Sequence, residues 1–189
     1  MPLPLTEDDY KQAAEKLGCD VPAVKAVAEV ESGKYGAFLA SGDPVILFER
    51  HKFHKFTGGK YDQSNPGISN KSPGGYGPVS QQHARFQEAC ALNSDAAMQS
   101  CSWGRFQVMG FNWQSLGYPS LQDFVDGMYV SEGNHLDSFV RFVKTNGLAK
   151  HLKNRNWAAF AKAYNGEDYK INKYDEKLAA AYKKYGGKP

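Results

Sequence analysis

Glu31 is the residue of this chain whose setting best suits acid chemistry. It ends a segment in which Val24, Val27 and Ala28 recur at helical spacing, so its carboxyl belongs to the apolar face of a predicted helix. An apolar and partly desolvated setting keeps a carboxylic acid protonated near neutral pH, as a proton donor requires. Such a donor could protonate the leaving oxygen of a glycosidic bond.

A second carboxylate usually accompanies the acid in glycosidases, where it activates water or acts as the nucleophile. Glu49 is the preferred candidate, because it follows the apolar stretch 45–48, a predicted strand that would hold it at a cleft edge. Glu49 could instead form a structural ion pair with Arg50 or Arg105. Asp43, in a Gly-Asp-Pro turn, is the competing candidate, although Asp in such a sequence is more often a turn former.

The histidines suggest a metal site as a weaker alternative to carboxylate catalysis. His51 and His54 are spaced i, i+3, which permits a shared metal, but a zinc site needs a third ligand and none is obvious nearby. We therefore expect no metal and no cofactor, and His51 would instead tune Glu49. A metal-dependent amidase or endopeptidase would depend on these histidines alone. The glycine-rich segment 74–77 lies in a loop rich in Pro and Ser and is interpreted as flexible, not as a phosphate-binding loop.

Capping residues delimit the helices that must position Glu31. Thr6 begins a helix, with Asp9 as the second member of a capping box, and Gly18 ends it. Asp20 caps the following helix, which carries Glu31 and is predicted to terminate at Gly33.

The remaining pattern predicts an α+β fold that is mostly α-helical. Residues 35–48 lose the helical period and predict a small β-hairpin or sheet, and a short helix from Glu49 to Phe56 follows. Residues 57–80 form a long predicted loop. Further helices are predicted at 81–92, 94–101, 105–112, 121–144, 148–153, 157–165 and 173–185.

Composition limits the possible partners and compartments. The chain has 189 residues, 41% of them hydrophobic, and a net charge of +3, which suits one globular domain acting on an anionic polymer. The basic residues are too scattered for a nucleic-acid binder, and we expect a monomer. Cys19, Cys90 and Cys101 are expected to be reduced thiols, with a Cys90–Cys101 bridge as the alternative. The N-terminus does not read as a signal peptide, so cytosolic synthesis is expected.

Three segments resemble a known superfamily. Glu-Ser-Gly at 31–33, Ser-Trp-Gly-Arg-Phe-Gln-Val-Met at 102–109 and Ala-Tyr-Asn-Gly at 163–166 resemble, in order, the motifs of goose-type lysozymes and lytic transglycosylases. Ile-Leu-Phe-Glu-Arg-His at 46–51 resembles a string of the phage N-acetylmuramidase family, which supplies many endolysin catalytic domains. The resemblance extends from Leu5 to Tyr185 and implies a lysozyme-like fold.

The resemblance also implies an activity and roles for individual residues. Glu31 would protonate the leaving oxygen of the β-1,4 bond after N-acetylmuramic acid in bacterial peptidoglycan. Gln107 and Tyr164 would bind the N-acetyl group or flank the acid, and Asn165 would order the loop or donate to the substrate. Trp103, beside the second motif, could stack on a sugar.

The same resemblance sets expectations for the whole protein. It would be made in the host cytoplasm and reach the wall after release, with a holin expected. Residues 1–189 would form a single catalytic domain without a separate wall-binding module. A lytic transglycosylase, which uses one glutamate and leaves 1,6-anhydro ends, is an alternative, as is a wall-binding module without catalysis. Likeness to goose-type enzymes favours inversion over retention of configuration.

Overall fold

The computed structural model describes residues 2–31 and 36–188 of the chain. Its elements in chain order are α1 (Glu7–Leu17), α2 (Val21–Glu31), β1 (Ile46–Phe48), α3 (Arg50–Thr57), η1 (Val79–Gln81), α4 (Gln82–Leu92), α5 (Ser94–Gln99), β2 (Cys101–Trp103), β3 (Val108–Met109), η2 (Gly110–Asn112), α6 (Leu121–Val130), α7 (Glu132–Thr145), α8 (Ala149–Lys153), α9 (Trp157–Asn165), η3 (Glu167–Lys170) and α10 (Tyr174–Lys184). This is the mostly helical α+β fold that the sequence predicts.

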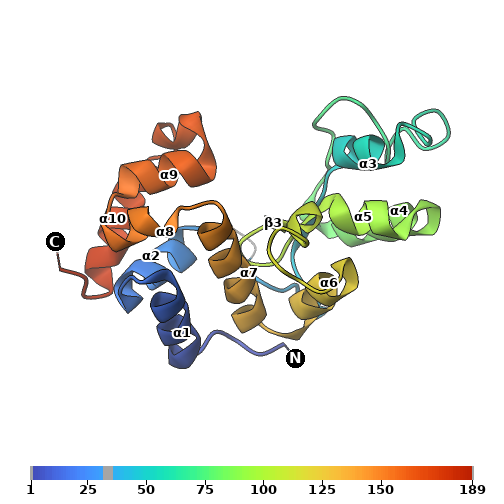
Figure 1. The fold of residues 1–189 in the computed structure, drawn as a ribbon. Helices are drawn as coiled ribbons and strands as arrows, with labels where there is room; N and C mark the ends of the chain where they lie inside the picture. The colour runs from blue at the N-terminus through green and yellow to red at the C-terminus, as the bar shows by residue number, and fades with distance from the viewer. Residues whose placement is uncertain (1, 32–35, 189) are drawn as a thin grey trace.

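The helices gather in two lobes (Figure 1). The first lobe contains α1, α2, α8, α9 and α10, and the second contains α3, α4 and α5. Helix α10 packs on α2 and α9, while α5 packs on α3 and α4. Helix α7 and the small sheet lie between the lobes (Figure 1).

The short helices at the N-terminus form where local chemistry predicts them. Thr6 and Asp9 make the reciprocal hydrogen bonds of a capping box at the start of α1, and Gly18 ends that helix in the left-handed conformation. The Asp20 carboxylate accepts the Ala23 amide at 3.2 Å and caps α2. The buried face of α2 consists of small and β-branched side chains, so the helix sits deep in the first lobe. Gly33, the predicted terminator, lies outside the described residues.

The sheet differs from the predicted hairpin. Residues 35–48 contribute one isolated bridge, Phe38 with Pro44, and β1 pairs instead with β2 in an antiparallel sheet of order β1-β2-β3. Ile46 lies opposite Trp103, and both are buried. The predicted hairpin is partly confirmed, because the Leu39 amide donates to the Asp43 carbonyl at 2.8 Å and the Val45 amide donates to the Ala37 carbonyl at 2.9 Å across the turn. The next residues, Ile46–Phe48, extend the pairing to β2, which the sequence did not predict.

Two helix predictions are wrong, because backbone pairing with other segments replaces or interrupts the helix. Residues 105–112 form no α-helix, because β3 pairs with β2 and only the 3₁₀ turn η2 follows. The predicted helix 121–144 is interrupted at Ser131, whose backbone is extended and whose hydroxyl accepts the Asn134 amide as the N-cap of α7. Leu3 pairs with Ser131, so the N-terminal arm occupies the break.

Two further features concern the cysteines and the length of the helices. Cys19, Cys90 and Cys101 are all free thiols in the described structure. The alternative Cys90–Cys101 disulfide is absent from it. Within residues 2–31 and 36–188, no helix has the length and apolar character needed to cross a bilayer.

Candidate active site

Glu31 lines a pocket of about 370 Å³ at the C-terminal end of α2. The turn between β2 and β3, helix α7, helix α9 and the start of α10 supply the other walls. Its lining residues are Glu31, Phe106, Gln107, Val108, Met109, Asn112, Phe142, Tyr164, Asn165 and Tyr174. Among these described residues Glu31 is the single acid, and most of its neighbours are apolar or aromatic.

The Glu31 carboxyl is held by one polar partner. Asn165 Nδ2 donates a hydrogen bond to Glu31 Oε1 at 3.1 Å, and no Lys, Arg or His of the described chain forms an ion pair with it. Burial raises the pKa of Glu31 above its usual range, and the Asn165 hydrogen bond lowers it by less. The site therefore favours a protonated carboxyl that can donate to a substrate.

Tyr164 fixes one wall of this pocket. Its hydroxyl donates to the Phe106 carbonyl at 3.2 Å, which links α9 to the turn after β2. Its ring packs parallel to Phe160 and edge-on to Phe142. Burial raises the pKa of Tyr164, so the hydroxyl stays neutral. Tyr164 thus lines the same pocket as Glu31, and its two suggested roles, flanking the acid or binding the N-acetyl group, stay predictions.

Gln107 also lines the pocket, but its amide is engaged in the fold. Its backbone has a positive φ of 49°, which is strained for a residue with a side chain. The side chain holds this turn, because Ser102 Oγ donates to its Oε1 at 2.7 Å and its Nε2 donates to the Gly104 carbonyl at 2.8 Å. The predicted contact of Gln107 with the N-acetyl group therefore stays a prediction, and a structural role is evident.

Glu49 lies between β1 and α3, on the second lobe, and does not line the Glu31 pocket. The alternative role of Glu49, an ion pair with Arg50 or Arg105, is absent from the described residues, and Arg105 binds Glu132 instead. The Glu49 carboxylate lies 3.6 Å from His51 Nε2 and 3.5 Å from the Tyr76 hydroxyl. His51 is therefore beside Glu49, as the sequence predicts.

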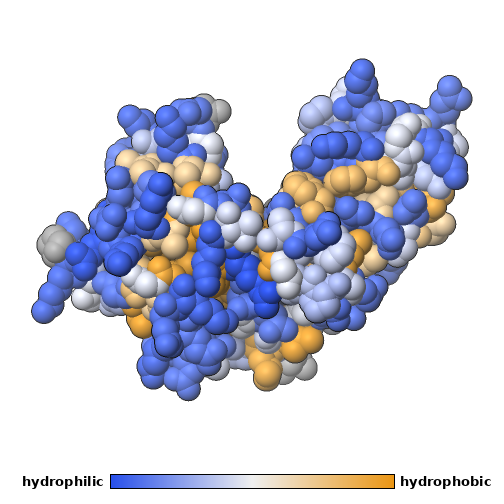
Figure 2. Space-filling view, viewed as in Figure 1, coloured by the Kyte–Doolittle hydropathy of each residue, from blue (hydrophilic) through white to orange (hydrophobic). Residues whose placement is uncertain are grey.

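A hollow separates the two lobes. Figure 2 shows it as an open notch, and Figure 1 in the same view places β3 at its base. Because Val108 and Met109 of β3 line the Glu31 pocket, that pocket borders the hollow at the first lobe. On the opposite side, β1 runs up into α3 (Figure 1), and Glu49 is the residue between them.

Comparison with known proteins agrees with this arrangement. The model of the N-acetylmuramidase family matches residues 20–186. The chain belongs to the N-acetylmuramidase family. It is 32% identical to the endolysin of Enterobacteria phage PRD1 over 113 residues, which is 57% of this chain and 72% of that protein. It is 42% identical to the crystal structure of the Burkholderia AP3 phage endolysin, with a TM-score of 0.93 over 98% of this chain and 73% of that one.

As a member of the N-acetylmuramidase family, the protein is a peptidoglycan hydrolase of the phage endolysin type. The fold is accordingly lysozyme-like, as the resemblance of the sequence motifs implies. The three motif segments meet at one place, because α2 supplies Glu31, the turn after β2 supplies Gln107, and α9 supplies Tyr164 and Asn165.

One predicted sugar contact, that of Trp103, is wrong. Trp103 is 0% exposed, and its indole nitrogen donates to the Met98 carbonyl at 3.1 Å. A sugar can stack only on an aromatic face that it can reach, so a buried ring offers none. Trp103 is the last residue of β2 and packs edge-to-face with Phe86, so its role is to hold the sheet.

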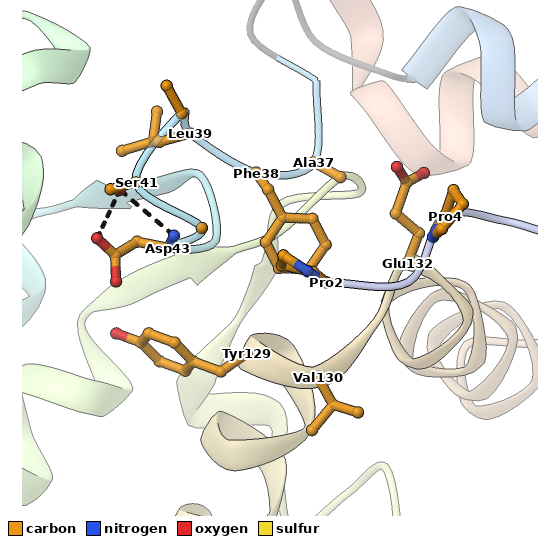
Figure 3. Close-up of a pocket in the computed structure, with 12 residues that line it drawn as sticks. Pro2, Pro4, Ala37, Phe38, Leu39, Ser41, Asp43, Tyr129, Val130 and Glu132 are labelled. Carbon is orange, nitrogen blue, oxygen red and sulfur yellow. Dashed lines mark hydrogen bonds between the residues drawn. The ribbon is translucent and has the colours of Figure 1, made fainter.

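Asp43 belongs to a different pocket from Glu31. It lines an open cavity of about 750 Å³ with Tyr129 and the N-terminal arm (Figure 3). Ser41 Oγ donates to its carboxylate at 2.7 Å, which is the bond of a turn former. Asp43 and Glu31 share no pocket among the described residues, so the structure does not support Asp43 as the second carboxylate.

Sequence reasoning missed several residues of the Glu31 pocket. Phe106, Met109, Asn112 and Phe142 line it, yet nothing in their spacing separates them from residues of the core. The histidines at 51 and 54 also have separate partners, since His54 Nδ1 binds Asp62 Oδ2 at 2.7 Å. In the described ranges, no cluster of three or more His, Cys, Asp or Glu residues is arranged to hold a metal.

Proposed function

We propose that the protein is an N-acetylmuramidase that cleaves the β-1,4 bond between N-acetylmuramic acid and N-acetylglucosamine, with Glu31 as the general acid. The observation that carries this proposal is the buried Glu31 carboxyl, whose pKa is raised, in a pocket beside the hollow between the lobes. Desolvation suits a carboxyl that must stay protonated until a glycosidic oxygen approaches it.

The roles of the neighbours follow from their contacts. Asn165 occupies Glu31 Oε1, which leaves Oε2 to carry the proton toward the leaving oxygen. As that bond breaks, the sugar gains oxocarbenium character, and a water must add to its anomeric carbon. Glu49 is the proposed base for this water. Its position on the opposite lobe supports a water-spaced arrangement of the carboxylates and hence inversion.

The decisive variant is Glu31→Gln, which keeps the shape of the side chain and removes its acid. We expect release of muropeptides from purified sacculi to fall by roughly 10²–10⁴-fold, the contribution of a general acid. Glu29→Gln is the matched control, because Glu29 lies on the same helix, is bound to Lys184 and Tyr185, and does not line the pocket. Full activity of Glu31→Gln would overturn the proposal.

Mass spectrometry of the released products separates the alternatives in the same experiment. Free reducing N-acetylmuramic acid ends support hydrolysis, whereas 1,6-anhydro ends would identify a lytic transglycosylase. A wall-binding module without catalysis would bind sacculi and release no muropeptides from the unaltered protein. Activity of the unaltered protein in the presence of a chelator would exclude the metal-dependent amidase that His51 and His54 suggest.

A further inference from the structure

The glycine-rich segment 74–78 is anchored to the second lobe, contrary to its interpretation as a flexible loop. Gln82 is only 1% exposed, and its Nε2 donates to the Tyr76 carbonyl at 2.6 Å and to the Pro78 carbonyl at 3.1 Å. The same side chain accepts the Phe48 amide at Oε1, at 2.9 Å. One buried amide thus ties the last residue of β1, directly before Glu49, to the loop that carries Tyr76.

A second contact, between Gly75 and Arg50, packs this loop against the start of α3. A Cβ added to Gly75 would lie 2.8 Å from Arg50 Cζ, so the guanidinium packs flat against the glycine backbone. Gly75 also has a positive φ of 66°, a conformation that residues with side chains rarely adopt. Glycine at this position allows the loop to lie close enough for Tyr76 to reach the residues at the beginning of α3.

The Tyr76 hydroxyl stands between Glu49 and His51. It lies 3.5 Å from Glu49 Oε2 and 3.3 Å from His51 Nδ1. One arrangement of protons satisfies both contacts, with His51 Nδ1–H donating to the tyrosine oxygen and the tyrosine O–H donating to the carboxylate.

Glu49 has few other restraints. It occupies the N-cap position of α3, but its side chain makes no capping hydrogen bond. In the described part of the chain, no Lys or Arg pairs with it, and its side chain is still 17% exposed. Both contacts to Tyr76 and His51 use Oε2, so Oε1 remains available to accept a proton from water.

We propose that Tyr76 is a positioning residue that, together with His51, orients the Glu49 carboxylate toward the attacking water. This inference rests on the proposed function, in which Glu49 is the second carboxylate. The buried Gln82 amide binds the carbonyls of Tyr76 and Pro78 and so fixes the loop. The loop places the Tyr76 hydroxyl, which donates to Glu49 Oε2. A base must be aimed at the water within a fraction of an ångström to be effective, so loss of this restraint acts on the chemical step.

Tyr76→Phe tests the inference, because it removes the hydroxyl and keeps the ring. We expect kcat on soluble glycan fragments of peptidoglycan to fall by about ten- to a hundredfold, the value of one hydrogen bond to a charged group, with little change in KM. Tyr61→Phe is the matched control, since its hydroxyl lies on the same lobe and donates to the Leu92 carbonyl at 2.8 Å. Thermal unfolding verifies that both variants fold.

A double-mutant cycle with Glu49→Gln separates positioning from a structural effect. Tyr76→Phe should reduce kcat in the unaltered protein but cause no further loss when Glu49 is already Gln. Equal losses in both backgrounds, or a Tyr76→Phe variant as active as Tyr61→Phe, would overturn the inference. An indifferent Glu49→Gln variant would overturn it as well. These outcomes leave the role of Glu31 intact, whereas full activity of Glu31→Gln would remove the proposed function itself.

Discussion

Two opposing influences act on the Glu31 carboxyl, and they come from different parts of the chain. Burial in the pocket raises its pKa, while the amide of Asn165 stabilises the charged form and lowers it. The amide comes from the end of α9, far along the sequence, and approaches the carboxyl at 3.1 Å. Asn165 therefore keeps the acid from becoming too weak to give up its proton.

Asn165→Ala should shift the pH dependence of the reaction in a defined direction. Without the donor, the charged carboxylate is less stable, so the pKa of Glu31 rises further and the protonated acid persists to higher pH. The basic limb of the kcat/KM profile should therefore move to higher pH, as measured by muropeptide release in a series of buffers. Asn146→Ala, which removes an exposed amide bound to the Phe142 carbonyl, should leave the limb in place. If the basic limb of the kcat/KM profile stayed in place in Asn165→Ala, the role of Asn165 in lowering the pKa of Glu31 would be contradicted.

At the scale of elements, the turn after β2 is fixed by its contact with α7. His135 of α7 is 0% exposed, donates from Nε2 to the Met128 carbonyl at 2.7 Å, and accepts the Arg105 amide at Nδ1 at 3.1 Å. A Cβ on Gly104 would lie 2.7 Å from the same ring, so only glycine allows the approach. This contact places the 105–109 segment, which carries Phe106 and Gln107, against the pocket.

The buried His135 should make folding sensitive to mild acid. Burial lowers the pKa of His135, so below about pH 6.5, the ordinary value for histidine, the unfolded chain takes up a proton that the folded chain refuses. Its contribution to stability is complete above that pH and is lost as the pH falls toward the folded pKa. Thermal melts in steps from neutral to acid pH should show a smaller decline of Tm for His135→Gln. His151→Gln, on α8, serves as the control, and an unchanged decline in His135→Gln would contradict this account.

At the scale of the whole molecule, burial protects the three thiols to different degrees. Cys101 lies in the buried β2, and burial raises its pKa well above the usual range. Burial also raises the pKa of Cys90, and that of Cys19 to about 11. Because the thiolate is the reactive form, each thiol should be slow to react while the fold is intact.

A thiol-reactive chromogenic disulfide measures this directly. The native protein should react slowly at neutral pH, and after unfolding without reductant it should yield all three thiols counted in the sequence. Lysis of sacculi should be the same with and without reductant. A yield of a single thiol after unfolding would instead indicate the Cys90–Cys101 bridge.

Much of the first lobe and the position of the acid could be predicted from the sequence. The capping box at Thr6, the cap at Asp20 and the apolar stripe that leads to Glu31 are interactions between residues within about four positions of one another. Such interactions are visible in a short window, because the helix period fixes which neighbours meet. The motif segments around Glu31, Gln107 and Asn165 could be recognised for the same reason, although their side-chain roles could not.

Only the tertiary structure decided which of the candidate residues can act together. It paired β1 with β2 across more than fifty residues, buried Trp103 at the end of β2, and placed Asp43 in a separate cavity. It also brought Tyr76 to Glu49 through the buried amide of Gln82. The exposure and the distant partners of a side chain depend on how whole elements pack, and packing free energy is shared among residues from every part of the chain.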